Sequence, residues 1–369
     1  MTPETTKPQR LVSLDAFRGF TIAAMLFVNN KGGDPAAFSP QFDHAPWGQL
    51  ITFTDLIFPW FLFMVGVSLP LSAASFRKKN PHRWMWFWKA FKRMLILILF
   101  GCLISCSLYK TLAIGTGGVL QLIGLAFFAG VLLYELPVRI RYLTAGLMLV
   151  IYWVLLRFIS FPGPDGQYLS ILTEDVNYTA YLRSLLPAKL SGLPSVIPTA
   201  PLIILGTLAG ELFLNKTLES MKRLKMLFLM GAGLMVCGVL WHFDLMMSKA
   251  LWTPSYILFS AGTGCWMLAA FYYLTDMKGW KKIAFPFVVF GMNAITAYFF
   301  SIIVRIHTVQ EWSISNALGE KVTLWQIWQD SFVSLCGPIA GSWGFILSYL
   351  LVWWIVLYWM YRKNIFLKV

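Results

Sequence analysis

The chain has 369 residues, of which 58% are hydrophobic and only 12% are charged. Soluble domains are nearer about 45–50% apolar and about 25% charged, so this composition excludes an ordinary soluble enzyme. An aromatic content of 17% also excludes a disordered scaffold. The net charge of +14 does not indicate nucleic-acid binding, because membrane proteins carry excess Lys and Arg beside anionic headgroups. We therefore expect a lipid bilayer, and no nucleic acid, as the partner.

Apolar runs long enough to span a bilayer recur along the whole chain. They lie at about residues 12–30, 50–74, 90–108, 117–134, 142–158, 197–214, 224–242, 255–274, 284–304 and 340–361. A shorter apolar stretch at 325–338 is interpreted as a re-entrant or interfacial helix. The predicted fold is an all-α polytopic membrane protein with about ten transmembrane helices, forming a single transmembrane domain over residues 1–369.

The distribution of Lys and Arg predicts the orientation. With the N-terminus inside, the inner segments hold 21 Lys and Arg residues, beginning with Lys7 and Arg10, and the outer segments hold 8. Because these residues are retained on the cytoplasmic side, both termini are predicted to be cytoplasmic. Two predicted outer segments are long, residues 159–196 and 305–339, and long loops of this kind usually serve as lids or substrate loops.

Polar side chains inside the first predicted span are the first functional signal, since ionisable groups at membrane depth are costly. Arg18 and Asn29 lie on nearly the same helical face, and Asp15 is about 60° from Arg18 at ~100° per residue. This polar stripe favours a lining for an elongated ligand. The alternative is an Asp–Arg pair at the interface with Asn29 as a cap.

The second signal is a histidine at the rim of the membrane. His44 lies in an outer loop before the second span, Asp55 lies inside that span, and Pro59 is expected to kink the helix near Asp55. A lone rim histidine is more often structural, but the clustering of Asn29, His44 and Asp55 favours acid–base catalysis near neutral pH. No metal site is predicted, because Cys102 and Cys106 share a helix face without any histidine or carboxylate.

At these residues the sequence resembles the transmembrane acetyltransferase family of heparan-alpha-glucosaminide N-acetyltransferase, in a short bacterial-type form without the luminal domain. The resemblance covers nearly the whole chain. It rests on the stretches Ser13–Gly19, Phe27–Asn29, Phe42–Trp47, Asp55–Trp60, Gly118–Gln121, Gly206–Gly210, Lys249–Trp252 and Phe290–Ala294. Where the family has tyrosine or glycine beside the matched asparagine, this chain has Asn30 and Lys31, so the amine pocket is expected to differ locally.

The resemblance implies transfer of an acetyl group from cytosolic acetyl-CoA to the amine of glucosamine, or of a glucosamine-ended saccharide, on the outer side. It implies catalytic roles for His44 and Asn29, and we add Asp55 as the residue that orients the imidazole. We expect donor binding by Asp15, Arg18 and Gln121 and acceptor binding by Trp60, Lys249 and Trp252. A bacterial inner membrane and a homodimer are also expected.

Three questions stay open at this level. Direct transfer and a ping-pong route through an acetyl-histidine fit the same residues. O-acetylation of an envelope glycan would need the same histidine and a different acceptor. A sugar transporter without chemistry is the alternative from another class, although a transporter site is expected near the midplane at broken helices.

Overall fold

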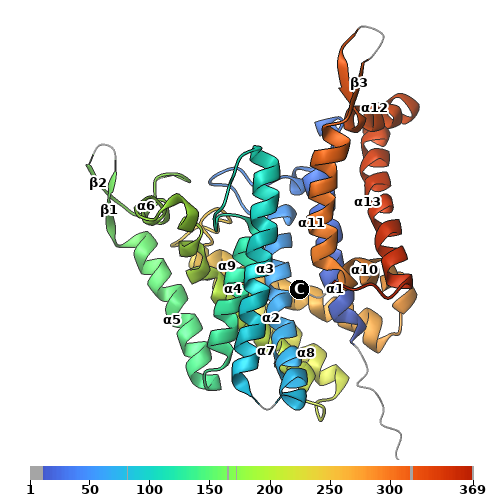
Figure 1. The fold of residues 1–369 in the computed structure, drawn as a ribbon. Helices are drawn as coiled ribbons and strands as arrows, with labels where there is room; N and C mark the ends of the chain where they lie inside the picture. The colour runs from blue at the N-terminus through green and yellow to red at the C-terminus, as the bar shows by residue number, and fades with distance from the viewer. Residues whose placement is uncertain (1–10, 81, 164–165, 172, 316–318, 368–369) are drawn as a thin grey trace, which may run out of the picture.

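The computed structural model describes residues 11–80, 82–163, 166–171, 173–315 and 319–367 (Figure 1). Lys7 and Arg10, counted above among the inner charges, lie outside the described residues. The described part contains thirteen α-helices: α1 (Val12–Asn30), α2 (Phe53–Lys79), α3 (Arg83–Tyr109), α4 (Val119–Tyr134), α5 (Val138–Arg157), α6 (Tyr178–Leu185), α7 (Val196–Leu214), α8 (Ser220–His242), α9 (Pro254–Tyr272), α10 (Lys281–Met292), α11 (Ala294–Val304), α12 (Leu324–Cys336) and α13 (Pro338–Arg362). The strands form two antiparallel hairpins, β1 (Ser160–Gly163) with β2 (Gly166–Leu169) and β3 (Ser313–Ser315) with β4 (Lys321–Thr323).

The expected all-α polytopic membrane fold is confirmed. In the described ranges, eight helices are long and apolar enough to cross a bilayer, and α10 with α11 makes a ninth candidate that bends by 69°. The predicted fourth span corresponds to α4, whose 16 residues extend only about 24 Å at 1.5 Å per residue. The stretch predicted as interfacial is α12, which Figure 1 shows lying across the end of α13.

The two ends of the bundle differ in structure and charge. One end, here called the hairpin end, carries β1–β4, α6 and α12 (Figure 1). The other end carries the α2–α3, α4–α5 and α7–α8 connections with their cluster of Lys and Arg, and is called the basic end. The positive-inside bias predicts that the basic end faces the cytoplasm.

Helix α2 lies at the centre of the bundle. In the most apolar 18-residue stretch of α2, 72% of the residues are buried, compared with 17% in the corresponding stretch of α8 at the periphery. Close helix crossings depend on glycines: a Cβ on Gly19 of α1 would lie 1.6 Å from the Phe287 carbonyl oxygen of α10, and one on Gly206 of α7 would lie 2.3 Å from the Phe63 carbonyl oxygen of α2. Small residues at such positions let helix backbones approach closely within a membrane.

The start of α2 is fixed locally. Thr52 and Asp55 form a capping box, in which the Thr52 backbone N–H donates to Asp55 Oδ2 at 3.1 Å. Asp55 therefore lies in the first turn of α2, at the hairpin end, rather than deeper in the span that we predicted from residue 50. The break between α10 and α11 falls at Asn293, whose side-chain amide donates to the Ile365 carbonyl and whose oxygen accepts from the Leu367 N–H.

Candidate active site

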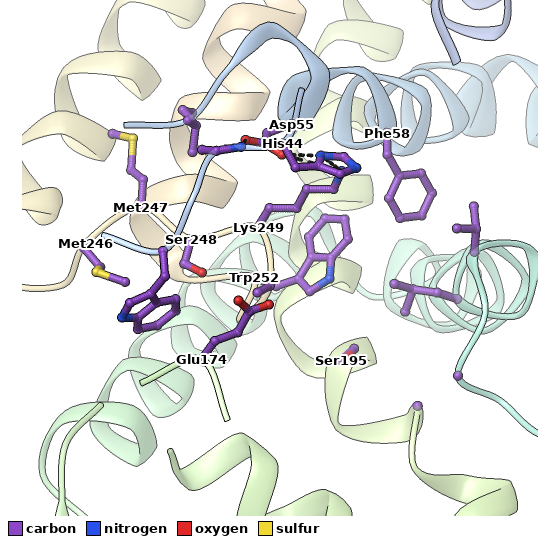
Figure 2. A pocket seen from close by; sticks show the side chains of 18 of the residues that line it. His44, Asp55, Phe58, Glu174, Ser195, Met246, Met247, Ser248, Lys249 and Trp252 are labelled. Atoms are coloured by element: carbon purple, nitrogen blue, oxygen red, sulfur yellow. Dashed lines mark hydrogen bonds and ion pairs between the residues drawn. The ribbon is translucent and has the colours of Figure 1, made fainter. Parts of the chain in front are cut away.

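A pocket of about 570 Å³ opens at the hairpin end (Figure 2). Four segments that are distant in sequence line it: residues 44–58, 116–122, 174–195 and 246–252. The pocket thus combines the start of α2, the loop before α4, part of the expected lid segment and the α8–α9 connection. We call it the outer pocket.

Three ionisable side chains meet in the outer pocket. His44 Nδ1 lies 2.8 Å from Asp55 Oδ1, and Lys249 Nζ lies 3.1 Å from His44 Nδ1 and 3.7 Å from Asp55 Oδ1. Lys249 Nζ is also 3.5 Å from His44 Nε2, so the ammonium lies close to both ring nitrogens. With Nδ1–H donated to the carboxylate, Nε2 keeps its lone pair for chemistry in the pocket.

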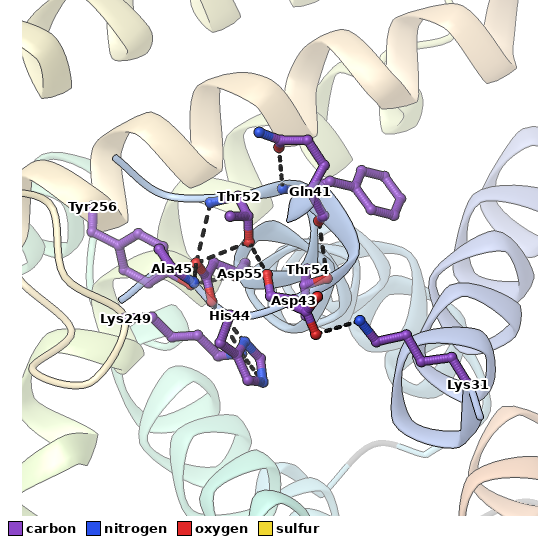
Figure 3. Close-up of polar contacts among 11 residues, drawn as sticks. Lys31, Gln41, Asp43, His44, Ala45, Thr52, Thr54, Asp55, Lys249 and Tyr256 are labelled. Atoms are coloured by element: carbon purple, nitrogen blue, oxygen red, sulfur yellow. Dashed lines mark hydrogen bonds and ion pairs between the residues drawn. The ribbon is translucent and has the colours of Figure 1, made fainter. Parts of the chain in front are cut away.

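Asp55 is held firmly in place (Figure 3). Its side chain is only 4% exposed, and Oδ2 accepts from the Ala45 N–H, the Thr52 N–H and the Thr52 hydroxyl, each at 3.1 Å. The Tyr256 hydroxyl of α9 donates to its backbone carbonyl at 2.5 Å. Because Oδ2 is occupied by these donors, Oδ1 is left to orient His44 and to pair with Lys249.

The loop that carries His44 is tied to its neighbours on both sides. Lys31, just after α1, forms an ion pair with Asp43, the residue before His44 (Figure 3). The Phe53 N–H donates to the Gln41 side-chain oxygen at 3.0 Å, which anchors the loop to the start of α2. The His44 side chain itself stays 60% exposed. The loop thus presents the imidazole to the pocket without burying it.

Lys249 and Trp252 come from a strained connection between α8 and α9. Trp252 adopts φ +55°, a left-handed conformation that is costly for a side chain of this size, and its ring packs edge-on against Phe58 at 5.4 Å. Burial lowers the pKa of the Lys249 ammonium, and its pairing with Asp55 partly offsets the decrease. Such strain and such a shifted lysine are features that concentrate at functional sites.

A second cavity, of about 660 Å³, lies toward the basic end and is called the inner cavity. Among the described residues, its lining includes four cations and no carboxylate: Arg18, Lys89, Lys92 and Arg93. Arg18 donates to the Ser68 hydroxyl at 2.6 Å, and Nε of Arg93 is buried without a hydrogen-bond partner among the described residues. The cavity is also lined by Ala294 and Ile295, the first residues of α11, and helix N-termini favour anions.

One face of α2 lines both spaces. Phe58 lines the outer pocket, while Phe61 and Val65 line the inner cavity. Residues spaced at i, i+3 and i+7 share a helical face. The two spaces therefore follow one another along α2 and are separated by about one turn, or roughly 5 Å of helix rise.

The structure brings some of the predicted site residues together and not others. His44, Asp55, Lys249 and Trp252 line the outer pocket, and Arg18 lines the inner cavity. The other four predicted residues line neither: Asn29, Asp15, Trp60 and Gln121.

The surroundings of these four residues differ. Asn29 is exposed near the end of α1, and Asp15 is buried 3.8 Å from Arg18. The indole of Trp60 is buried and donates to the Thr263 hydroxyl at 2.9 Å. Gln121 is buried, and its amide lies so close to Gly118 that a Cβ there would come within 2.2 Å of its oxygen. Trp60 and Gln121 thus lie buried among neighbouring helices, and their binding roles stay predictions.

Sequence reasoning missed two charged residues of the outer pocket, Glu174 and Arg183. Only their position in the long outer segment 159–196 could have indicated them. It also missed the capping box, for which the signal was present as Thr52 followed three residues later by Asp55. Within the described ranges, no group of three or more His, Cys, Asp or Glu side chains is placed to hold a metal ion.

Comparisons with a family model and with two known proteins all indicate the same family. Residues 10–239 match the family described as "Heparan-alpha-glucosaminide N-acetyltransferase, catalytic". The chain is 26% identical over 426 aligned positions to heparan-alpha-glucosaminide N-acetyltransferase of Homo sapiens, covering 98% of this chain and 60% of that protein. It is 34% identical over 133 positions to the protein of the same name from Mus musculus, covering 34% of this chain and 20% of that protein. The chain therefore spans 60% of the length of the human relative, which is less than two thirds. Because the family match extends over more than half of the sequence, the chain belongs to the heparan-alpha-glucosaminide N-acetyltransferase catalytic family.

Proposed function

We propose that the chain is a membrane acetyltransferase that moves an acetyl group from acetyl-CoA at the basic end to the amine of a glucosamine, or of a glucosamine-ended saccharide, at the hairpin end. The observation that carries this proposal is the His44–Asp55–Lys249 cluster in the outer pocket, about one turn of α2 from a cation-lined inner cavity. A reaction between substrates on two sides of a membrane needs such an arrangement. Membership of the family supports the reaction type.

The inner cavity suits the donor. Acetyl-CoA carries several phosphate charges, and Arg18, Lys89, Lys92 and Arg93 offer cations with no carboxylate among the lining residues. Nε of Arg93, which has no hydrogen-bond partner among the described residues, provides a buried donor for a phosphate oxygen. Cavities of about 300–1,000 Å³ are typical for ligands of this kind. The narrow thioester arm would then extend along the α2 face past Phe61 toward Phe58.

The outer pocket suits the chemistry of thioester aminolysis. The amine nitrogen attacks the thioester carbon, His44 Nε2 accepts the amine proton, and the carbon–sulfur bond breaks. The proton then passes from His44 to the departing thiolate, giving an amide and free CoA. Asp55 holds the imidazole tautomer, and the Lys249 ammonium lies where it can stabilise the negative charge of the tetrahedral intermediate.

A contribution from Asn29 remains part of this proposal, although its side chain lies outside the outer pocket. Asn29 is two residues from Lys31, which pairs with the residue before His44. Alanine at Asn29 should therefore lower turnover less than alanine at His44.

Activity in sealed, oriented vesicles tests the proposal. Purified protein in vesicles with the basic end outward should form N-acetylglucosamine from external acetyl-CoA and glucosamine trapped inside, as measured by mass spectrometry. With the opposite orientation, external acetyl-CoA should give no product. Uptake of glucosamine without acetylation would favour a transporter, and acetylation of hydroxyl groups alone would favour the O-acetyltransferase.

Location and assembly are the remaining parts of the proposal. Both termini are expected on the cytoplasmic side of a bacterial inner membrane, because most Lys and Arg residues lie at the basic end. Cysteine labelling at the two ends in intact cells measures this orientation. The expected homodimer is tested by the mass of the protein in lipid nanodiscs.

A further inference from the structure

Glu174 is an unpaired carboxylate in the wall of the outer pocket. It lies between β2 and α6, within the long segment expected to act as a lid or substrate loop. Its side chain is exposed and, within the described ranges, makes no hydrogen bond or ion pair. Its backbone carbonyl accepts from Asn177 Nδ2 at 2.7 Å, which fixes this part of the loop beside α6. The loop therefore places a negative charge in the pocket without neutralising it.

The other charged residues of the pocket have partners. Asp55 is paired with His44 and Lys249, and its second oxygen accepts three further hydrogen bonds. Arg183 donates to the Ser195 hydroxyl at 3.0 Å. The Ser195 hydroxyl holds the Arg183 guanidinium without cancelling its charge. Among the described lining residues, Glu174 is therefore the carboxylate left for a cationic ligand, and Arg183 is the charge that opposes one.

The aromatic wall of the pocket also favours a cation. Trp252 is held in its strained backbone conformation between Phe58 and Tyr256, with ring centroids 5.4 Å and 5.7 Å away. Figure 2 shows Glu174 extending from its loop toward the segment that carries Ser248, Lys249 and Trp252. Tryptophan faces attract ammonium groups, most strongly where water is excluded. Glu174 and Trp252 both line the pocket, so a carboxylate and the exposed part of an indole (Trp252 is 6% exposed) are available there to an organic ammonium ion.

We propose that Glu174 is the specificity-determining residue of the acceptor pocket, and that it binds the acceptor as a protonated amine, so that cationic amino sugars are selected over neutral sugars. This inference rests on the proposed function, which identifies the acceptor as an amino sugar. It concerns only the binding step. Before the attack described above, the bound ammonium loses one proton to water in the open pocket, and His44 then accepts the second proton as the carbon–nitrogen bond forms. Because Glu174 is exposed, water screens its pairing with the ammonium, and loss of this pairing should weaken binding by about 2- to 5-fold.

Competition binding with two sugars tests the proposal on the intact protein in nanodiscs. Glucosamine and glucose differ in one amino group, so the ratio of their dissociation constants reports recognition of the cation. Glu174→Gln should weaken the binding of glucosamine about 2- to 5-fold and leave the binding of glucose nearly unchanged, so that the ratio approaches one. Arg183→Gln, which removes a positive charge from the same pocket, should shift the ratio in the opposite direction. Asp175→Asn, an exposed neighbour outside the pocket lining, is the matched control and should have no effect.

Kinetics then separate this inference from the proposed function. Glu174→Gln should raise KM for glucosamine and change kcat by less than about 3-fold, since the residue acts on binding. A ratio of dissociation constants that is the same in wild type and Glu174→Gln would overturn the role of Glu174, whatever the activity. A loss of both sugars together would indicate a structural role and would equally overturn it. If the wild type acetylates no amine but still prefers glucosamine through Glu174, the proposed reaction fails and the cation site stands.

Discussion

Replacing His44 by alanine separates catalysis from folding in this protein. The side chain is 60% exposed, and its described contacts are to Asp55 and Lys249, which keep each other as partners when the imidazole is removed. The free energy of unfolding should therefore change by no more than about 1 kcal/mol, the net value of a typical hydrogen bond. Loss of a general base should nevertheless lower turnover by at least ~10², which corresponds to about 2.7 kcal/mol in the activation free energy.

The assay is N-acetylation of glucosamine by the purified variant in nanodiscs, with its melting temperature and its affinity for acetyl-CoA measured on the same sample. His307→Ala is the matched control, because His307 is a similarly exposed histidine that pairs with Glu311 and lines neither the outer pocket nor the inner cavity. It should remain fully active. A His44→Ala protein that transfers acetyl groups within a few-fold of wild type would refute the proposed mechanism. A large drop in melting temperature would show instead that His44 supports the fold.

Three further predictions follow from the same contacts. Because burial lowers the pKa of Lys249, kcat/KM should fall on the alkaline side of the pH profile as the Lys249 ammonium deprotonates. Lys249→Arg, which stays charged, should abolish this decrease, and an unchanged decrease would exclude Lys249 as its source. Arg93→Gln should raise KM for acetyl-CoA about 10-fold, and the wild-type KM should rise with ionic strength. A KM for acetyl-CoA that responds neither to the substitution nor to ionic strength would contradict the donor site. Gly19→Ala should destabilise the fold by about 2 kcal/mol or more, because the new Cβ would meet the Phe287 carbonyl, whereas Gly233→Ala has free space around its Cβ and should be neutral in thermal unfolding. Equal melting temperatures for the two variants would argue against the close contact of α1 with α10 at Gly19.

Much of the fold could be predicted from hydrophobicity alone, because a lipid-spanning helix leaves a long apolar run in the sequence. The exceptions have tertiary causes. The predicted span 284–304 is broken at Asn293, where the amide side chain bonds to the backbone of Ile365 and Leu367, more than seventy residues away. No local pattern distinguishes such an asparagine from one that bonds between intact helices. Helix α2 begins at Phe53, three residues after the predicted start of the span, because the capping residues Thr52 and Asp55 fix the first turn there.

The site was predictable where its partners are close in sequence. His44 and Asp55 are eleven residues apart, and their contact was expected from the loop and helix that carry them. Lys249 is 205 residues from His44, so only the folded bundle shows that it joins the same cluster. The placement of Asn29 in the same stripe as Arg18 depended on helical geometry alone. Helical geometry predicts that the two side chains share a face of α1, but it does not predict which neighbouring helix packs against that face.

The short separation of the two cavities along α2 has an electrical consequence. A membrane potential ordinarily falls across a hydrocarbon layer of about 30 Å. If water fills both cavities to within about one helical turn of each other, most of that voltage falls between Phe58 and Phe61. The local field is then several times stronger than elsewhere in the bilayer, and moving one elementary charge across the full potential changes its energy by about 2.3 kcal/mol per 100 mV. In that case, any step that carries net charge past this pair of phenylalanines proceeds at a rate that depends on the membrane potential.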